Sequence, residues 1–383
     1  MRALVLGAGL QGSACAFDLL RNDAVERVIV ADLNVDRLPP FLEKERGNAR
    51  LELLRLDARD EDAVLAAMGR ADACMNALPY YFNLQMATLA VRAGIHYADL
   101  GGNTGIVFQQ LELDGQARER GVSVIPDCGL APGMVNILAA AGIAELDRTD
   151  TVKIRVGGLP QDPQPPLNYQ IVYSLEGVLD YYTTASWVLR DGEPRQVEAL
   201  TEIESVEFPA PVGTLEAFHT AGGLSTLPWT YQGRVRSMEY KTLRYPGHAE
   251  IMRAIRDLGL LGTEPVEVKG QRVVPRELFI ACVEPRLRRP EGRDLVALRV
   301  EVEGEKEGRP RRIVYDLLDY YDEQAGISAM ERTTGFSLAI TGVMQMDGRI
   351  AKRGVFTPDQ GVPVEAYVAE LDRRGVRIGK RVE

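Results

Sequence analysis

Short apolar runs alternate with helical segments through the first third of the chain. Ala3–Leu6, Val28–Ala31 and Ala73–Ala77 are such runs, and Leu51–Leu56, His96–Leu100 and Val122–Ile125 continue the series. Runs of this length are typical of parallel strands that are buried on both faces. The segments between them carry helix signals; Phe82–Ala93, for example, is followed by Gly94 as a C-cap. Asp36–Arg46 and Gln109–Glu119 are also predicted as helices. The alternation predicts an α/β fold with a Rossmann-type doubly wound parallel sheet.

The pattern changes after Thr151. Strands are predicted in succession, and helices are fewer. The predicted strands are Val152–Val156, Val266–Val268, Leu295–Glu301 and Arg312–Tyr315, with a strand and hairpin turn at Trp187–Glu193. The predicted helices are Ser174–Tyr182 and Gly247–Leu258. This order is typical of an α+β domain with a mostly antiparallel sheet. We therefore predict a Rossmann domain over 1–130 and a substrate-binding and dimerisation domain over 131–334. A C-terminal segment, 335–383, with an apolar helix over Gly335–Asp347, is expected to return to the Rossmann domain.

A glycine motif lies between the first strand and the first helix. It is Gly7-Ala8-Gly9-Leu10-Gln11-Gly12, and its position between strand and helix is the one that a dinucleotide fingerprint requires. Gly7 allows the tight turn, Gly9 lets the backbone approach a pyrophosphate, and Gly12 lets helix and strand pack closely. The motif, including Leu10 and Gln11, is predicted to place a pyrophosphate on the free amides of the helix N-terminus.

The second strand ends in Asp32, twenty residues beyond Gly12. A carboxylate at this place accepts hydrogen bonds from the adenosine ribose and repels a 2′-phosphate. We therefore predict NAD as the cofactor, although Arg37 nearby could accommodate the phosphate of NADP.

Polar residues also follow the other strands, and ligands bind a doubly wound sheet at the carboxyl ends of its strands. Asp57 is expected beside the adenine, and Asn76, Ala77, Leu78 and Pro79 beside the nicotinamide ribose. Asp99, Leu100, Gly101 and Asp127 are expected to line the same crevice. For each of these residues, a role as a helix cap or turn residue is the alternative.

Composition narrows the class of protein. The net charge is −10 over 383 residues, with no basic stripe, which disfavours a nucleic-acid partner. No stretch of eighteen uncharged apolar residues occurs, so no membrane span is expected. The first strand begins directly after Met1, which predicts a cytoplasmic protein without a signal peptide. The four cysteines and three histidines are scattered, so no metal site is expected.

Two stretches of the second domain are rich in groups that could do chemistry. Glu216–Gly223 contains His219 and Thr220, and Glu239–His248 contains Lys241, Arg244 and His248. Arg244 has the planar fork that suits a substrate carboxylate. Structural ion pairs or dimer contacts are the competing explanation for these residues. Tyr173 and Glu176, at the start of a predicted helix, could add polar contacts to a substrate.

The chain resembles the saccharopine dehydrogenase–like family. The resemblance is carried by the glycine motif, Asn76-Ala77-Leu78-Pro79, Gly129-Leu130-Ala131-Pro132-Gly133 and the Tyr240–His248 stretch, and it extends to Ser174-Leu175-Glu176-Gly177 and Lys352-Arg353-Gly354-Val355. Within the family it is most similar to the lysine 6-dehydrogenases. The resemblance implies NAD-dependent oxidative deamination of the ε-amino group of L-lysine. The product would be 2-aminoadipate 6-semialdehyde, which cyclises to piperideine-6-carboxylate.

Family members that act on saccharopine carry an aspartate where this chain has Ala131, which favours lysine as the substrate. We expect Asp99 to hold the amine or a water, His219 or Lys241 to move protons, and Arg244 with His248 to bind the amino-acid carboxylate, with Tyr173, Glu176 and Thr220 nearby. We also expect a homodimer or a higher homo-oligomer. Two alternatives stay open: a saccharopine-type enzyme that acts on a secondary amine, and a dimeric NAD-binding module without activity.

Overall fold

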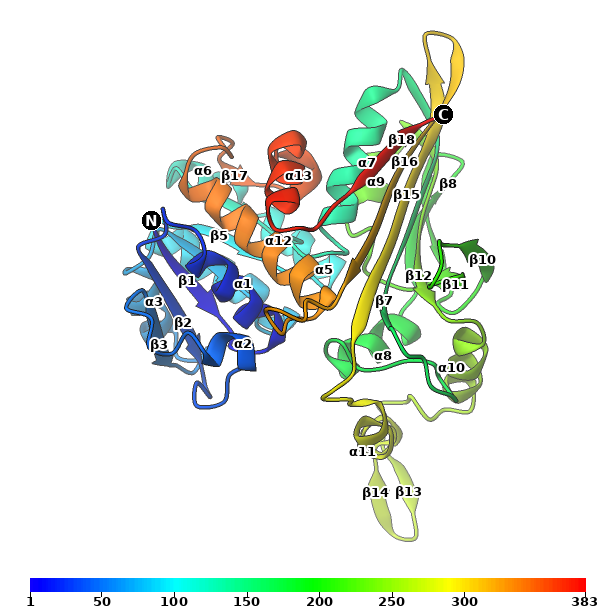
Figure 1. Cartoon of the computed structure of the whole chain (residues 1–383), viewed down its shortest axis with the longest axis horizontal. Coiled ribbons are helices and arrows are strands. Elements are labelled where there is room, and N and C mark those ends of the chain that lie inside the picture. Colours follow the sequence, from blue (N-terminus) through cyan, green and yellow to red (C-terminus); the bar gives the residue numbers. More distant parts are fainter.

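The structure is a computed structural model that describes residues 1–383. It has two halves, each built on one sheet, with a long helix and the C-terminal segment between them (Figure 1). The N-terminal half, blue to cyan, lies on the left of Figure 1, and the second sheet is seen nearly edge-on at the right.

The first sheet is parallel and has seven strands. They are β1 (Arg2–Leu6), β2 (Arg27–Asp32), β3 (Leu51–Arg55), β4 (Ala73–Asn76), β5 (His96–Asp99), β6 (Ser123–Ile125) and β17 (Gly354–Val355). Their order across the sheet is β17-β6-β5-β4-β1-β2-β3, which is the Rossmann order with one added edge strand. The order reverses between β1 and β4, and at this point the carboxyl ends open a crevice for a ligand. The predicted doubly wound sheet is confirmed.

Helices cover both faces of this sheet. The helices of the N-terminal half are α1 (Leu10–Leu20), α2 (Pro40–Glu43), α3 (Glu61–Met68), η1 (Tyr80–Phe82), α4 (Asn83–Ala93), α5 (Thr104–Leu111) and α6 (Asp114–Glu119). α3 and α4 pack on the face that carries Leu4, Leu6 and Ile29, whereas α1 packs on the face of Ala3 and Val5.

Two helix predictions in this half were wrong. The segment predicted as a helix over Asp36–Arg46 forms only the single turn α2, because Pro39 and Pro40 restrict the residues before them to extended backbone. The helix predicted over Gln109–Glu119 is two helices, of which α5 begins earlier, where the Asn103 side chain accepts a hydrogen bond from the Ile106 amide.

The second sheet is mixed and mostly antiparallel, as predicted. It consists of β7 (Arg148–Pro160), β8 (Ser186–Arg190), β9 (Glu193–Val197), β10 (Glu204–Glu207), β11 (Thr214–His219), β12 (Val235–Arg244), β15 (Asp294–Lys306), β16 (Arg309–Tyr320) and β18 (Gly379–Val382). Only β12 and β7 pair in parallel. The long antiparallel pair β15–β16 runs from Leu295↔Tyr320 to Lys306↔Arg309.

Helices of the second half pack mainly at one end and on one face of this sheet. They are α7 (Met134–Glu145), α8 (Leu175–Thr183), α9 (Leu227–Thr230), α10 (His248–Asp257) and α11 (Pro275–Leu287). α11 was not predicted from the sequence. A two-stranded hairpin, β13 (Val266–Val268) with β14 (Gln271–Val273), projects from this half at the bottom of Figure 1.

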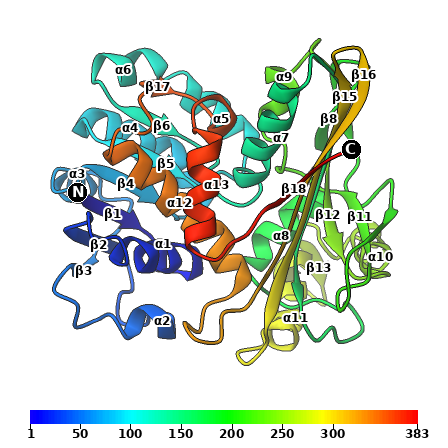
Figure 2. The same ribbon diagram turned by 45° about the horizontal axis from the view of Figure 1, so that its top comes forward.

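The chain from residue 329 onward joins the two halves. α12 (Ala329–Met346) starts before Gly335, where it was predicted to begin, because Ser328 and Glu331 form a capping box at its N-terminus. α12 packs against α1, and η2 (Pro358–Gln360) and α13 (Val364–Arg373) follow it. Figure 2 shows β18 leaving α13 for the edge of the second sheet, where it pairs with β16. The segment therefore contributes β17 to one sheet and β18 to the other.

One apolar core of 59 buried residues includes side chains from both sheets, α7 and α12. The two halves are therefore packed on each other and not merely tethered. No helix of the structure is long and apolar enough to span a lipid bilayer.

Candidate active site

The glycine motif forms the turn between β1 and α1. Gly7 has φ of +97°, a conformation that favours glycine, and a Cβ at Gly12 would lie 2.0 Å from the carbonyl oxygen of Gly7. A Cβ at Gly9 would meet no atom within 4 Å, so this glycine faces open space. The roles predicted for the three glycines agree with this geometry.

The start of α1 offers unpaired donors to that space. Gly9 is the N-cap and has no side-chain cap, and the amides of Leu10 and Gln11 have no acceptor in the protein. Both polar atoms of the Gln11 side chain are buried without a partner, while Leu10 is 43% exposed. An orphaned amide beside a free helix N-terminus fits the phosphates of a dinucleotide. Gly7, Gly9, Leu10, Gln11 and Gly12 would hold this group.

Asp32 ends β2 beside this turn. Its carboxylate accepts a hydrogen bond from the Ala8 amide at 2.7 Å and one from the Asn34 amide at 2.8 Å. Each oxygen keeps a lone pair for a ribose hydroxyl. Asp57 follows β3 by two residues and accepts hydrogen bonds from the Arg59 guanidinium and amide, which lower its pKa to about 2. Asp57 is thus ionised and held by its neighbour.

The turn after β4 passes close to the glycine motif, since a Cβ at Gly7 would lie 3.0 Å from the Ala77 carbonyl. Ala77, Leu78 and Pro79 therefore follow β4 beside the glycine turn, and their contact with a nicotinamide ribose stays a prediction. The prediction for the Asn76 side chain was wrong. It is fully buried, and its amide donates to Asn83 and to the Tyr97 hydroxyl, while its carbonyl accepts from Leu78. Asn76 shapes the turn and does not face a ligand.

Asp99 was expected to hold the amine or a water, and this prediction was wrong. Its side chain is fully buried, and its oxygens accept hydrogen bonds from the Gly101 amide at 2.7 Å, the Gln110 amide group at 2.7 Å and the Asp127 amide at 3.3 Å. Burial raises the pKa of this carboxyl, and the hydrogen bonds oppose that shift. Asp99 ties together the turns after β5 and β6. Leu100 and Gly101, with φ of +70° at Gly101, follow it at the crevice.

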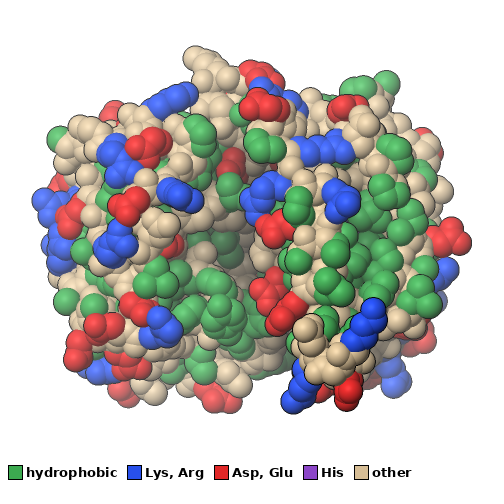
Figure 3. All heavy atoms as spheres, turned by 90° about the horizontal axis from the view of Figure 1, so that it is seen from below, with side chains coloured by type: hydrophobic (Ala, Val, Ile, Leu, Met, Phe, Trp, Pro, Cys, Tyr) green, Lys and Arg blue, Asp and Glu red, His purple; other side chains and the backbone are tan.

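A hollow separates the two halves when the molecule is seen from below (Figure 3). A cavity of about 290 Å³ lies between the halves, and both contribute to its wall. Tyr80 and Gly102–Gly105 come from the N-terminal half, and Tyr181, Trp187, Gly222, Leu224 and Ser225 from the second half, among others. The size is at the lower end of the range of small-molecule sites. Glu176 lies on the first turn of α8, next to this wall, and is exposed.

Arg244 ends β12 and is 2% exposed. It has no carboxylate partner: Nη1 donates to the carbonyls of Leu243 and Gly158, and Nε is buried without an acceptor. Its guanidinium lies 4.9 Å from the centre of the Tyr169 ring. Burial acts to lower the pKa of Arg244, but the facing tyrosines Tyr182, Tyr169 and Tyr173 together raise it above its usual value. Tyr173, one of these tyrosines, is only partly buried. An unpaired buried guanidinium is an uncommon arrangement and fits an anionic ligand.

His248 was expected to share the carboxylate with Arg244, and this prediction was wrong. Its Nδ1 donates to the Leu167 carbonyl at 3.0 Å, and its Nε2 accepts from the Tyr182 hydroxyl at 2.9 Å. Burial, helped by the charge of Arg244, lowers the pKa of His248 to about 3, so the ring is neutral. His248 orients Tyr182 and has no donor left for a substrate.

His219 and Lys241 were expected to move protons, and these predictions were wrong because of strand alternation. Met238 and Tyr240 of β12 pack into the core shared by both halves, so Lys241 points to the opposite face of the sheet. Its Nζ donates to the Glu202 carbonyl at 2.8 Å and lies 3.4 Å from Glu204. His219 Nε2 contacts Glu202 at 3.2 Å on that same far face.

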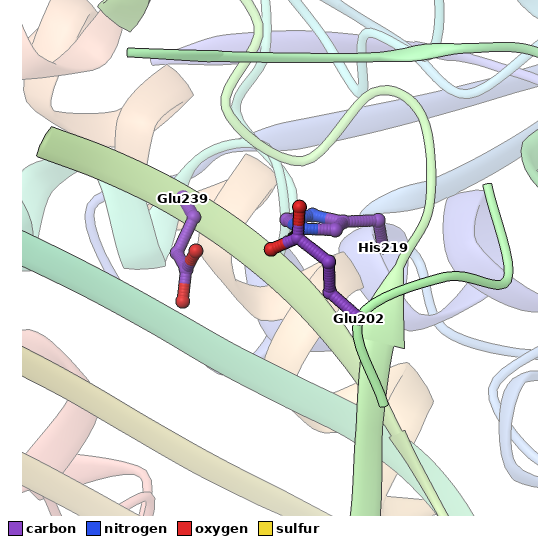
Figure 4. A group of neighbouring side chains, drawn as sticks. All are labelled: Glu202, His219 and Glu239. Carbon is purple, nitrogen blue, oxygen red and sulfur yellow. Dashed lines mark hydrogen bonds and ion pairs between the residues drawn. The ribbon is translucent and has the colours of Figure 1, made fainter. Parts of the chain in front are cut away.

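Glu202, His219 and Glu239 lie close together on this far face (Figure 4). One carboxylate oxygen or ring nitrogen from each side chain lies within 4.8 Å of the others. Arg190 pairs with Glu202 and with Glu239, both at 2.9 Å, and Lys241 lies 3.7 Å from Glu239. These two cations neutralise both carboxylates. The arrangement is therefore explained as an ion-pair cluster.

The cleft face of β12 carries residues that the sequence did not single out. Thr242 lies 2.7 Å from Thr220, hydroxyl to hydroxyl, and 3.5 Å from the Tyr240 hydroxyl. Gly223 permits the close approach of Tyr240, whose ring would lie 2.4 Å from a Cβ at that position. The predicted Thr220 thus belongs to a buried hydroxyl group at the cleft face. Alternation along β12 is the sequence signal that links Tyr240, Thr242 and Arg244.

Both halves match family models. Residues 3–125 match the saccharopine dehydrogenase NADP-binding domain, and residues 129–376 match the saccharopine dehydrogenase C-terminal domain. A saccharopine dehydrogenase (NADP+, L-glutamate-forming) of Pyricularia oryzae is 23% identical and is covered over 88% of its length by 86% of this chain. The carboxyaminopropylagmatine dehydrogenase of Synechocystis is 22% identical, with 98% of this chain and 96% of the relative covered.

Two solved structures share the fold. The apo saccharopine dehydrogenase (L-Glu forming) of Saccharomyces cerevisiae has a TM-score of 0.80 at 20% identity, over 100% of this chain and 99% of that one. The homospermidine synthase of Legionella pneumophila in complex with NAD has a TM-score of 0.70 at 10% identity, over 100% and 91%. At these identities the likeness shows the fold alone. The two family models, however, cover nearly all of the chain, and the protein belongs to the saccharopine dehydrogenase family.

Proposed function

We propose that this protein is a nicotinamide-dependent oxidoreductase that oxidises a carbon–nitrogen bond of an amino-acid-derived amine. The observation that carries the proposal is Arg244, a guanidinium that is 2% exposed and has no carboxylate partner. A bidentate pair with a substrate carboxylate would compensate the buried charge. Family membership and the glycine motif support the oxidoreductase class.

We propose NAD, not NADP, as the cofactor. The Asp32 carboxylate, fixed by the Ala8 and Asn34 amides, lies where a 2′-phosphate would have to fit and would repel it. A bound nicotinamide would accept a hydride from the carbon that carries the substrate nitrogen. The chain itself orients the substrate: Arg244 and Tyr173 hold its carboxylate end, and the cavity wall encloses its amine end.

Two substrates are candidates. The names of the Pyricularia and Synechocystis relatives support a secondary amine of the saccharopine type. Ala131 supports the ε-amine of L-lysine. This residue lies in the turn after β6, half-buried against the core, and offers no carboxylate where saccharopine-acting members of the family are expected to have one. Oxidation of lysine would release ammonia and 2-aminoadipate 6-semialdehyde, which cyclises.

The proposal is tested by mixing the protein with NAD or NADP and either L-lysine or saccharopine at alkaline pH, and recording the absorbance of the reduced cofactor. Ammonia as the released product would identify the primary amine as substrate, and glutamate the secondary amine. No reduction with any amine of a broad panel would contradict the proposal and favour a binding module.

The role of Arg244 is tested by Arg244→Lys. The lysine side chain keeps the positive charge but cannot form the bidentate hydrogen bonds of a guanidinium. The Michaelis constant of the amino-acid substrate should therefore rise about 10- to 100-fold, as expected for a lost charge-assisted hydrogen bond. The Michaelis constant of the cofactor should not change. Arg236→Lys, an exposed arginine of the same strand, is the matched control and should leave both constants unchanged. An unaltered amino-acid constant in Arg244→Lys would remove Arg244 from the site.

A further inference from the structure

Asp127 is a buried carboxyl group with an unused oxygen. It follows β6, is 2% exposed, and accepts a hydrogen bond at Oδ2 from the Ser225 hydroxyl at 2.5 Å. Its Oδ1 is buried without any partner. A Cβ at Gly101 would lie 1.9 Å from this Oδ1, so only glycine leaves room for the carboxyl beside the crevice. Asp127 comes from the N-terminal half, and Ser225 from the second half.

Ser225 connects this carboxyl group to the cavity between the halves. It lines the cavity together with Tyr181, Gly222 and Gly102. Because the Ser225 hydroxyl donates its proton to Asp127, its lone pairs remain free to accept a hydrogen from a ligand. Both residues have a left-handed backbone, with φ of 64° at Asp127 and 49° at Ser225. Such conformations are uncommon outside glycine and cluster at functional sites.

We propose that Ser225 and Asp127 form a relay that removes a proton from the protonated (ammonium) form of the substrate amine in this cavity. This inference rests on the proposed function. The substrate N–H bond breaks, and the proton bonds to Ser225 Oγ. At the same time the original Ser225 O–H bond breaks, and that proton bonds to Asp127 Oδ2. The electron pair of the broken N–H bond stays on nitrogen, which becomes the neutral amine that hydride loss from the adjacent carbon requires.

Ser225 is the catalytic residue of this pair, because its hydroxyl touches the substrate, and Asp127 acts through it. The titratable groups that face Asp127 are Asp99 at the end of β5, Asp359 in η2, Tyr181 in α8 and the neighbouring Cys128, and no cation is among them. Burial, helped by Asp99 and Asp359, raises the pKa of Asp127 to about 8, and the Ser225 hydrogen bond opposes this shift. The ionised form that accepts a proton therefore accumulates as the pH rises through about 8.

The test measures turnover against pH for the full-length protein with the amine that reduces the cofactor best. In the plot of turnover against pH, wild type should show an ascending limb, a rise in turnover near pH 8. Asp127→Asn keeps the shape and tolerates the left-handed backbone, but it should lower turnover about 100-fold or more and abolish that limb. Ser225→Gly removes the hydroxyl while relieving the backbone conformation. It should lower turnover similarly and move any remaining limb to higher pH.

Two controls separate the relay from a structural role. Asp99→Asn removes the charge of the neighbouring buried carboxyl, so the ascending limb should remain but move to lower pH, even if the melting temperature falls. Ser186→Ala removes another hydroxyl of the cavity wall and should also keep the limb. Affinity for NADH, measured by fluorescence, shows that each variant is folded. The double variant Asp127→Asn/Ser225→Gly should lose no more turnover than the worse single variant, because the two residues act as a unit.

A limb that persists in Asp127→Asn, or losses that multiply in the double variant, would overturn the relay. These outcomes require an active wild type, so they differ from failure of the proposed function. That failure appears as no cofactor reduction by the wild type with any amine, and it would remove the relay as well.

Discussion

Two single residues, Arg244 and Asp127, carry charge into buried surroundings without full compensation. Arg244 lacks an acidic partner, and Asp127 keeps one oxygen without a hydrogen bond. Buried charges are normally paired because desolvation is costly. Asp99 and Asp32, by contrast, are satisfied by backbone amides. The unsatisfied atoms of Arg244 and Asp127 are the ones that our proposals assign to a ligand, whereas Asp99 holds two turns of the fold. Asp32 is fixed by amides and keeps lone pairs for the proposed ribose contact.

The proposed preference for NAD over NADP depends on one carboxylate, that of Asp32. Asp32→Asn keeps an acceptor for the Ala8 or Asn34 amide but removes the charge that repels a 2′-phosphate. We expect the Michaelis constant of NAD to rise about tenfold, because a charge-assisted hydrogen bond becomes a neutral one. Discrimination against NADP should shrink. Asp36→Asn, which alters the exposed partner of Arg55, is the control and should leave the ratio unchanged. Unchanged preference in Asp32→Asn would mean that the ribose is held elsewhere.

At the scale of the element, β12 divides its side chains between two tasks. Tyr240, Thr242 and Arg244 lie on one face of the strand, where Tyr240 packs into the core shared by both halves, whereas Glu239 and Lys241 belong to the ion-pair cluster on the far face. The strand thus carries the residues of the proposed substrate site on one face and an ion-pair cluster on the other.

Neighbouring substitutions on β12 should therefore have opposite effects. Lys241→Met breaks contacts with Glu204 and Glu239, so the free energy of unfolding should fall by about 1–3 kcal/mol while turnover stays within about twofold. Thr242→Val removes a hydroxyl at the cleft and should lower turnover with a smaller loss of stability. Thermal melts and steady-state rates distinguish the two. A large loss of turnover in Lys241→Met with an unchanged melt would restore Lys241 as a catalytic candidate.

The N-terminus of α12 should make stability depend on pH. Burial raises the pKa of Glu331, the third residue of the capping box, to about 7 from a usual value of 4.5. A group whose pKa is raised in the folded state contributes stability that is fully present below pH 4.5 and is lost as the pH rises through about 7.

Glu331→Gln keeps the capping box but cannot ionise. Relative to wild type, the variant should gain up to about 3 kcal/mol between pH 5 and pH 8, as the pKa difference implies. Melting temperatures of both proteins at the two pH values measure this change. An equal difference at both pH values would mean that Glu331 titrates normally.

At the scale of the whole molecule, α12 connects the second half to the cofactor turn. A Cβ at Gly335 would lie 2.5 Å from Cβ of Ala14 and 2.7 Å from the Gln11 carbonyl oxygen, both in α1. The helix that begins beside the second sheet therefore packs directly on the helix that would receive the pyrophosphate. The predicted domain boundaries and the homo-oligomer stay predictions.

Gly335→Ala should therefore affect both stability and cofactor binding. Overpacking against α1 should cost about 1–3 kcal/mol and weaken NADH binding, since the Gln11 backbone must shift. Gly115→Ala, in α6, is the matched control: a Cβ there meets no atom within 4 Å, so stability should be unchanged or slightly higher. Calorimetry and fluorescence titration check both. NADH affinity equal to wild type in Gly335→Ala would contradict the coupling.

The sequence by itself determined the first sheet except for its edge strand β17, together with the glycine turn and the position of Asp32, because these depend on local periodicity and on the backbone needs of glycine. It also placed Arg244 among the candidate residues. It could not decide which face of β12 meets the other half, since alternation fixes only that Tyr240 and Lys241 point in opposite directions. Tertiary packing made that choice, and it moved His219 and Lys241 away from the cleft. Packing likewise brought Ser225 to Asp127 across the chain, a contact that no local pattern encodes.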